Sequence, residues 1–268
     1  MKTKPSFSEF KQMTAQGDLI PVYEEFLADV ETPVSAYLKI RDKRFSYLLE
    51  SATGGERWGR YSFIGYKPYV VVMSRGREVE IQEGDETRIL KDVENPLLVL
   101  RDLSRKYTPV TSDDLAPFQG GLVGYFNFDL IRKWEYLPGF APEDNDVPEC
   151  LFAASSRLII FDHLKHRMTV VAFARLRNGK DPEEVYSQAC REIEEMKEEL
   201  GRPLPAYSGS NDFSLTELQP NFKKEEFEAA VRKAKDYIVA GDIIQVVLSQ
   251  RFSGEMSGED FLLYRNLR

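Results

Sequence analysis

The clearest pattern of apolar and polar positions predicts an amphipathic helix that begins at Asp181-Pro182 and ends at Gly201. Apolar residues recur there at steps of four and three, the spacing that puts side chains on one face of a helix. Two glutamates in the first turn complement the helix dipole. The apolar stripe consists of Val185, Ala189, Ile193, Met196 and Leu200. We therefore expect this helix to bury one face.

Short runs rich in β-branched and aromatic residues dominate the chain from residue 17 to about 175. Residues 69–73 and 78–81 flank a short glycine turn and predict a β-hairpin. Residues 157–161 and 168–173 flank a polar turn and predict another antiparallel pair. This part of the chain is therefore expected to be mainly antiparallel sheet.

Helix signals occur at three further places. Ser6-x-x-Glu9 is typical of a capping box and predicts a short helix ending at Gly17. Asn95-Pro96 combines a capping side chain with a proline in the first turn, which predicts a second helix. The stretch 202–221 is rich in Pro, Ser, Gly and Asn and is the best linker candidate.

The third helix signal follows this linker and ends at Gly241. Its apolar stripe consists of Phe227, Val231, Ala234 and Ile238. The segment Ile243–Phe252 is then predicted to be a strand, and since side chains of a strand alternate in direction, Gln245 and Val247 would share one face.

Composition limits the class of protein. The 268 residues are 42% hydrophobic and 30% charged, which is typical of a globular protein large enough to bury a core. The net charge of −8, with acids and bases interspersed, argues against a nucleic-acid partner. No apolar run is long enough to span a membrane, and no signal sequence follows Met1. Cys150 and Cys190 have no metal or redox spacing, so we expect a cytoplasmic protein.

Residues that could carry chemistry are few. His163 and His166 could supply two metal ligands, but no third ligand is evident and we expect solvated turn residues. The acidic run at 144–146 lacks the glycine and distal glutamate of a calcium loop. The glycine-rich stretch 120–124 lacks the Lys-Ser/Thr of a phosphate loop. We expect its glycines to let a strand bend or to let a neighbouring backbone approach closely.

Three segments nevertheless resemble one protein family in its own order. They are Leu48–Ser51 continuing through Gly54–Gly65, Phe118–Phe126 with Asp129, Arg132 and Glu135, and Ala240–Phe252. On these motifs the chain resembles the N-terminal portion of anthranilate synthase component I, the large subunit of a chorismate-utilising enzyme. Each motif alone is moderately specific for this family, and the three motifs in the family's order are strong evidence for the resemblance.

The resemblance implies an α+β fold with two packed antiparallel β-sheets and helices outside. It implies an N-terminal tryptophan-sensing domain at 1–175, a helix and linker at 176–221, and the start of a truncated chorismate-binding domain at 222–268. Family members continue well beyond this length, so the main catalytic residues and the ligands of the Mg²⁺ cofactor are expected after residue 268.

The resemblance also implies the reaction and the partners. The intact subunit converts chorismate and ammonia into anthranilate and pyruvate, with the ammonia supplied by a glutamine amidotransferase subunit. L-Tryptophan, the end product of the pathway, inhibits by binding the N-terminal region. The part of the chain present here is expected to be inactive alone.

Leu49, Glu50 and Ser51 are the expected tryptophan-binding residues. A carboxylate and a hydroxyl at a strand end could receive the ammonium and other donors of an amino acid. On the residues alone, Glu50 would be an exposed strand end and Ser51 a turn former. The resemblance favours ligand binding. For Arg60, a structural role between sheets is favoured over ligand contact, and the role of Trp58 stays open.

Gln245 is the residue of this chain expected to lie near chorismate. In relatives that add water to chorismate, a lysine stands at this place and serves as base, whereas relatives that add ammonia have glutamine. An ordinary polar strand residue is the alternative. Glutamine also stands here in aminodeoxychorismate synthase component I, which is the enzymatic alternative. The other alternative is a non-catalytic, truncated subunit that binds tryptophan.

Overall fold

The computed structural model describes residues 2–41, 44–51, 59–138, 147–177, 179–204 and 214–268. The chain divides into two compact units, residues 1–205 and 206–268, which we describe one at a time. The division lies inside the segment 176–221, whose helix belongs to the first unit. The predicted functional assignment of 1–175, 176–221 and 222–268 stays a prediction.

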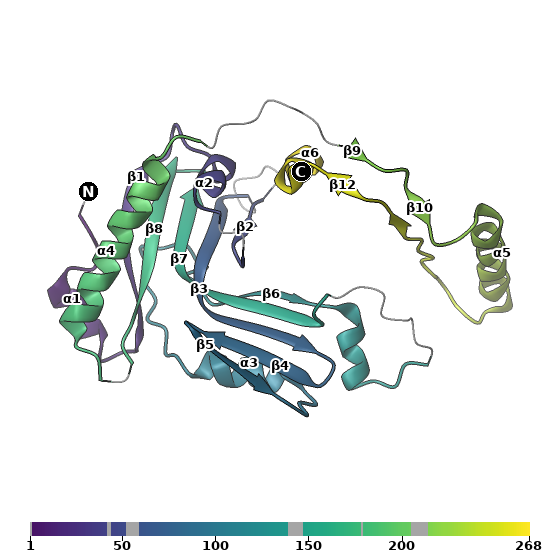
Figure 1. Ribbon diagram of the computed structural model, residues 1–268, viewed down its shortest axis with the longest axis horizontal. Coiled ribbons are helices and arrows are strands. Elements are labelled where there is room, and N and C mark those ends of the chain that lie inside the picture. Colours follow the sequence, from purple (N-terminus) through teal and green to yellow (C-terminus); the bar gives the residue numbers. More distant parts are fainter. Residues whose placement is uncertain (1, 42–43, 52–58, 139–146, 178, 205–213) are drawn as a thin grey trace. The chain divides into compact units, whose positions relative to one another are not determined.

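The first unit is built on an eight-stranded antiparallel sheet (Figure 1). The main path through the sheet runs β1-β8-β7-β3-β4-β5, with β2 paired to β3 and β6 paired to β7. The strands are β1 (Leu19–Leu27), β2 (Tyr47–Leu49), β3 (Tyr61–Arg75), β4 (Glu78–Glu83), β5 (Glu86–Leu90), β6 (Leu122–Phe126), β7 (Cys150–Asp162) and β8 (Arg167–Arg175). Both predicted hairpins are confirmed, as the pairs β3–β4 and β7–β8.

Two long strands, β3 and β7, join the two halves of this sheet. Their register shifts between Pro68 and Val70. Before the shift β3 pairs with β2, and after it with β4. Strand β7 changes neighbours in the same way, from β6 to β8. The expected α+β class with antiparallel sheets and helices is therefore confirmed, and the expected two sheets are continuous through these two strands.

Helices cover both halves of the sheet. They are α1 (Phe7–Met13), α2 (Pro33–Ile40), α3 (Pro96–Arg105), the short 3₁₀ helix η1 (Phe128–Lys133) and α4 (Pro182–Gly201). Helix α4 packs on β8 and β1, and α1 and α2 contact α4 (Figure 1). All five residues of its predicted stripe are buried in the core cluster that also holds Phe10 and Ile20. Helix α3 contributes Leu100 and Leu103 to the core of the other half.

The predicted helix starts are confirmed. Ser6 and Glu9 form a capping box at α1, and the Asn95 side chain accepts a hydrogen bond from the backbone N–H of Leu97. Helix α1 ends at Met13, before the predicted end at Gly17, because the backbone continues as a turn. A Cβ at Gly17 would lie 2.2 Å from the carbonyl oxygen of Thr108, so this glycine permits a close backbone contact.

The second unit contains the predicted helix but not the predicted strand. Its elements are β9 (Ser214–Leu215), β10 (Gln219–Pro220), α5 (Lys224–Ala240), β11 (Phe252–Ser253), β12 (Met256–Ser257) and α6 (Asp260–Leu267). Helix α5 ends at Gly241 in the left-handed conformation, as the glycine stop predicts. The strand prediction for Ile243–Phe252 is wrong except at Phe252. A strand needs a neighbouring backbone to pair with. In the described part of this unit, β10 pairs with β11 at Phe252 and Ser253, and the residues before Phe252 have no paired strand.

Candidate functional site

The expected tryptophan-binding residues lie at the end of β2, in the first unit. Strand β2 is held by β3, where Tyr47 faces Gly65 and Leu49 faces Phe63. The Tyr47 ring occupies the space that a Cβ at Gly65 would need, at 2.1 Å. Leu49 is exposed, Glu50 is half-buried and Ser51 is exposed. The strand therefore ends with its polar side chains beside solvent.

An aromatic cluster connects this strand end to the glycine-rich motif. The rings of Phe63 and Phe118 meet edge to face at 5.0 Å between centroids, and Tyr61 lies 6.1 Å from Phe63. All three pack against a core cluster that includes Leu158 and Ile160. The fold thus brings the first and second motifs into contact. Periodicity could not predict this pairing, although both phenylalanines belong to the family motifs.

Arg60 has a structural role, but it links neighbouring strands of one sheet and does not lie between two sheets. Its guanidinium donates to both carboxylate oxygens of Asp162, at 2.7 Å from Nη2 to Oδ2 and 3.1 Å from Nε to Oδ1. Burial acts to raise the pKa of Asp162, but hydrogen bonds from Arg60 and from the backbone of Lys165 and Leu164 outweigh it and hold this pKa below its ordinary value. Arg60 therefore fixes the β7–β8 turn to the start of β3. Trp58 lies outside the described residues.

The two histidines lie in the turn between β7 and β8, as predicted. His163 Nε2 is 2.8 Å from the hydroxyl of Ser62, and His166 adopts a left-handed backbone conformation. Within the described ranges, no group of three or more His, Cys, Asp or Glu side chains is arranged to hold a metal ion. His163 and His166 therefore do not belong to any such group of metal-binding side chains. The acidic run 144–146 lies outside the described residues.

Of the glycines in the second motif, Gly124 permits the predicted close approach of a neighbouring backbone, whereas Gly120 lies against a side chain and Gly121 has no close neighbour. Gly120 has a φ of +110°, and a Cβ there would lie 2.7 Å from Cζ of Phe173. A Cβ at Gly124 would lie 1.9 Å from the carbonyl oxygen of Leu151 on the paired strand. On η1, Arg132 donates to Asp129 at 2.8 Å and to the carbonyl of Leu137. The motif therefore builds a sheet edge and the short helix after it.

Gln245 lies in the second unit and is exposed. The segment around it forms no strand, and Ile244 is 98% exposed. Near the C-terminal end of this segment, the backbone N–H of Arg251 donates a hydrogen bond to the Asn221 side chain at 2.9 Å. The predicted alternation of Gln245 and Val247 on one strand face is therefore wrong for the chain in this form.

Comparison with known proteins decides the family. A profile described as "chorismate binding enzyme" matches residues 45–268. The chain belongs to this family. It is 39% identical to anthranilate synthase component 1 of Synechocystis over 98% of this chain and 54% of the relative. It is 35% identical to the protein of the same name from Aquifex aeolicus over 100% of this chain and 54% of the relative. The resemblance drawn from the three motifs is confirmed.

The fold is also similar to a solved structure. Anthranilate synthase component I from Streptococcus pneumoniae TIGR4 matches with a TM-score of 0.62 and 27% identity, covering 91% of this chain and 52% of that chain. The chain thus spans about half the length of the relatives it matches. Among the helices that the structure describes, none is both long and apolar enough to cross a membrane.

Proposed function

We propose that this chain forms the front portion of an anthranilate synthase component I. In the complete protein, chorismate reacts with ammonia to give anthranilate, pyruvate and water. The observation that carries the proposal is the similarity to anthranilate synthase component 1 along almost the whole chain, at 35–39% identity. The order of the three motifs supports it.

Leu49, Glu50 and Ser51 form part of a feedback site for L-tryptophan in this proposal. Glu50 is half-buried at the end of β2, where a carboxylate can pair with an ammonium group. The exposed hydroxyl of Ser51 can donate or accept a hydrogen bond beside it. Leu49 faces Phe63, so an aromatic surface lies next to these polar groups. Together they offer partners for both ends of an aromatic amino acid.

Gln245 lies beside the substrate in the complete protein and favours amination over hydration. A lysine with a lowered pKa could deprotonate water, whereas ammonia is already a nucleophile and needs no such base. A glutamine side chain can hydrogen-bond to substrate or ammonia without removing a proton. Its exposed position in the second unit leaves it free to contact further chain or ligand.

Residues 1–268 do not sustain this reaction alone in our proposal, because they correspond to about half of each relative. The function implies Mg²⁺, a cytoplasmic location and a glutamine amidotransferase subunit as the source of ammonia. The described residues include no group suited to the metal. In our proposal, its ligands belong to the second half of the complete protein.

Growth of a tryptophan auxotroph tests this proposal. A chimera that joins Arg268 to the corresponding second half of the Synechocystis relative should restore growth in a bacterium lacking its own component I. Residues 1–268 alone should not, and neither should the chimera with Gln245→Lys. Rescue of a p-aminobenzoate auxotroph instead would identify an aminodeoxychorismate synthase. Rescue of neither by a soluble, folded chimera would contradict the proposed function.

A further inference from the structure

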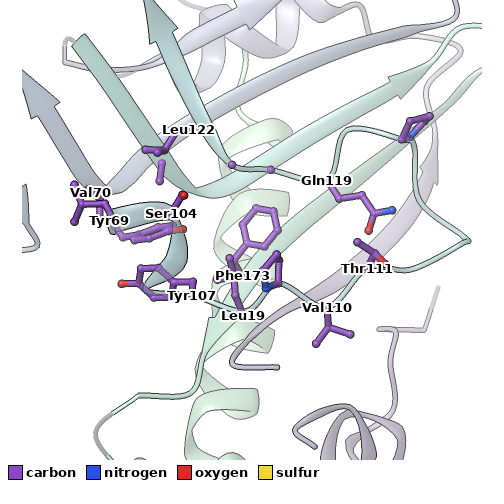
Figure 2. A pocket seen from close by; sticks show the side chains of 16 residues that line it. Leu19, Tyr69, Val70, Ser104, Tyr107, Val110, Thr111, Gln119, Leu122 and Phe173 are labelled. Carbon is purple, nitrogen blue, oxygen red and sulfur yellow. The ribbon is translucent and has the colours of Figure 1, made fainter. Parts of the chain in front are cut away.

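A pocket of about 360 Å³ lies in the first unit, separate from the end of β2. It is bounded by the start of β1, by β3, by the end of α3 and by the irregular segment that leads to β6 (Figure 2). This volume lies in the range typical of small-molecule sites. Aliphatic and aromatic side chains dominate its lining, and none of the described residues that line it is charged.

The polypeptide around the pocket is held in place by specific contacts. The Gln119 side chain accepts a hydrogen bond from the backbone N–H of Ser112 at 2.9 Å and donates to the Ser112 carbonyl at 2.8 Å. This pair closes the segment 112–119 into a loop beside the pocket. The Tyr69 and Tyr107 rings pack edge to face at 5.3 Å on the opposite side. The Phe173 ring lies between these two walls (Figure 2).

Tyr69 is the residue that points to a ligand. It is only 9% exposed, and its ring extends toward the middle of the pocket (Figure 2). In the part of the chain that the structure describes, its hydroxyl forms no hydrogen bond. A tyrosine hydroxyl can donate one hydrogen bond, so a ligand in the pocket that accepts this hydrogen bond would have a partner there.

Two arginines favour negative charge at this hydroxyl. Arg175 lies 4.6 Å from the Tyr69 ring centroid and Arg177 lies 4.2 Å from that of Tyr107. Neither guanidinium forms an ion pair within the described residues. Both arginines line a second, polar cleft on the other side of the tyrosines, and neither lines the apolar pocket, so they act on the hydroxyl through their charge and not by direct contact with the ligand. This cleft also holds glutamates, one of which, Glu83, pairs with Lys106. Burial raises the pKa of Tyr69 to about 12, and the charges of both arginines oppose that rise.

We propose that this pocket binds a small aromatic carboxylate. The ring of the ligand lies against Phe173 and Leu122, and its carboxylate accepts a hydrogen bond from the Tyr69 hydroxyl. The site lies entirely within the first unit and does not depend on the reaction proposed for the complete protein. It is also distinct from Leu49–Ser51, none of which lines the pocket.

Titration of residues 1–268 with 4-fluorobenzoate, followed by fluorine NMR, tests this site. We expect saturable binding that weakens roughly tenfold in Tyr69→Phe, which keeps the ring and removes the hydrogen bond to a charged group. Tyr125→Phe on exposed β6 is the matched control and should bind as the parent does. Uncharged 4-fluorobenzamide should bind more weakly than the carboxylate.

A second variant and a second measurement keep the test independent of folding defects. Ser104 lines the pocket from an exposed position on α3, so Ser104→Trp should fill the pocket without disturbing the core and should abolish binding. Methyl shifts on titration should concentrate at Val70, Val110 and Leu122. The proposal is overturned by absence of saturable binding, by equal affinity in Tyr69→Phe and Tyr125→Phe, by equal binding of the benzamide, or by shifts located elsewhere.

Discussion

Gly120 is fixed by two independent constraints, its backbone conformation and the ring of Phe173. Its φ of +110° is rare for residues with a side chain, and the ring leaves no room for a Cβ. The neighbouring Gly121 has a φ of +125°, yet a Cβ there would meet no atom within 4 Å. A side chain at Gly121 would therefore meet only backbone strain, whereas a side chain at Gly120 would meet both backbone strain and a clash with Phe173.

We expect Gly120→Ala to destabilise the first unit more than Gly121→Ala does. Both variants pay for an unfavourable φ, about 1–3 kcal/mol, but only Gly120→Ala must also displace Phe173, at a further 1–3 kcal/mol or so. Urea unfolding followed by circular dichroism measures the difference. Equal loss of stability in the two variants would show that Phe173 moves freely.

At the proposed feedback site, Ser51→Phe in the completed chimera should weaken inhibition by tryptophan while leaving anthranilate formation largely intact. A bulky ring at this strand end would occupy ligand space, and loss of one or two hydrogen bonds corresponds to roughly tenfold weaker binding. The readout is the tryptophan concentration that halves activity. Thr87→Phe on exposed β5 is the control. A Ser51→Phe chimera as sensitive as the control would remove Ser51 from the site.

Helix α4 shows which elements a single sequence can predict. Its stripe, acidic first turn and glycine stop are all local signals, and every stripe residue is buried. The strand predicted at Ile243–Phe252 depends on a partner strand that the local sequence cannot identify. The contact between Phe63 and Phe118, 55 positions apart in the sequence, was unpredictable for the same reason. Local signals thus predicted elements and hairpin pairs, whereas long-range pairing and the pocket needed the structure.

A charge cluster adds to the apolar contact between α4 and the sheet. Arg157, on β7, is 4% exposed and pairs with Glu192 at 3.6 Å, with Glu199 at 3.5 Å and with Glu195. These glutamates recur at three- and four-residue steps, so they form one face of the helix. The Tyr66 hydroxyl donates to Glu199 at 2.8 Å.

The cluster predicts a dependence of stability on pH. The hydrogen bond from Arg157 holds the pKa of Glu195 below its ordinary value of 4.5. A lowered carboxyl pKa contributes stability above the ordinary value, and that contribution is lost as pH falls through the folded-state pKa. Glu195→Gln should therefore lose less stability than the parent between about pH 5 and pH 3. Urea midpoints across this range measure it.

The matched control is Glu198→Gln, an exposed residue on the same helix. Its acid-induced loss of stability should follow that of the parent. If Glu195→Gln and Glu198→Gln gave the same pH profile, the contact between Glu195 and Arg157 would not contribute to acid sensitivity.

At the scale of the whole molecule, the two units differ in how much core they contain. Among the described residues, every buried hydrophobic side chain lies between Phe10 and Leu200. Helix α5 in the second unit has no buried residue, although its apolar stripe includes Phe227 and Ile238. Hydrophobic burial is the dominant favourable contribution to folding, so stability should reside in the first unit.

Residues 1–205 should therefore keep the unfolding transition of the whole chain. We expect the urea midpoint of 1–205 to match that of 1–268, because residues 206–268 add little buried surface. Circular dichroism at 222 nm should show the loss of helical signal from α5 and α6 only. A marked fall in the midpoint of 1–205 would mean that the second unit stabilises the first.

The reaction itself is tested most directly by product formation from chorismate. The purified chimera, joined after Arg268 to the second half of the Synechocystis relative, is supplied with chorismate, Mg²⁺ and ammonium, and products are followed by anthranilate fluorescence and by pyruvate release. Our account predicts one pyruvate for each anthranilate, and no turnover by residues 1–268 alone. A folded chimera that leaves chorismate unchanged, or turnover by residues 1–268 alone above a protein-free sample, would contradict it.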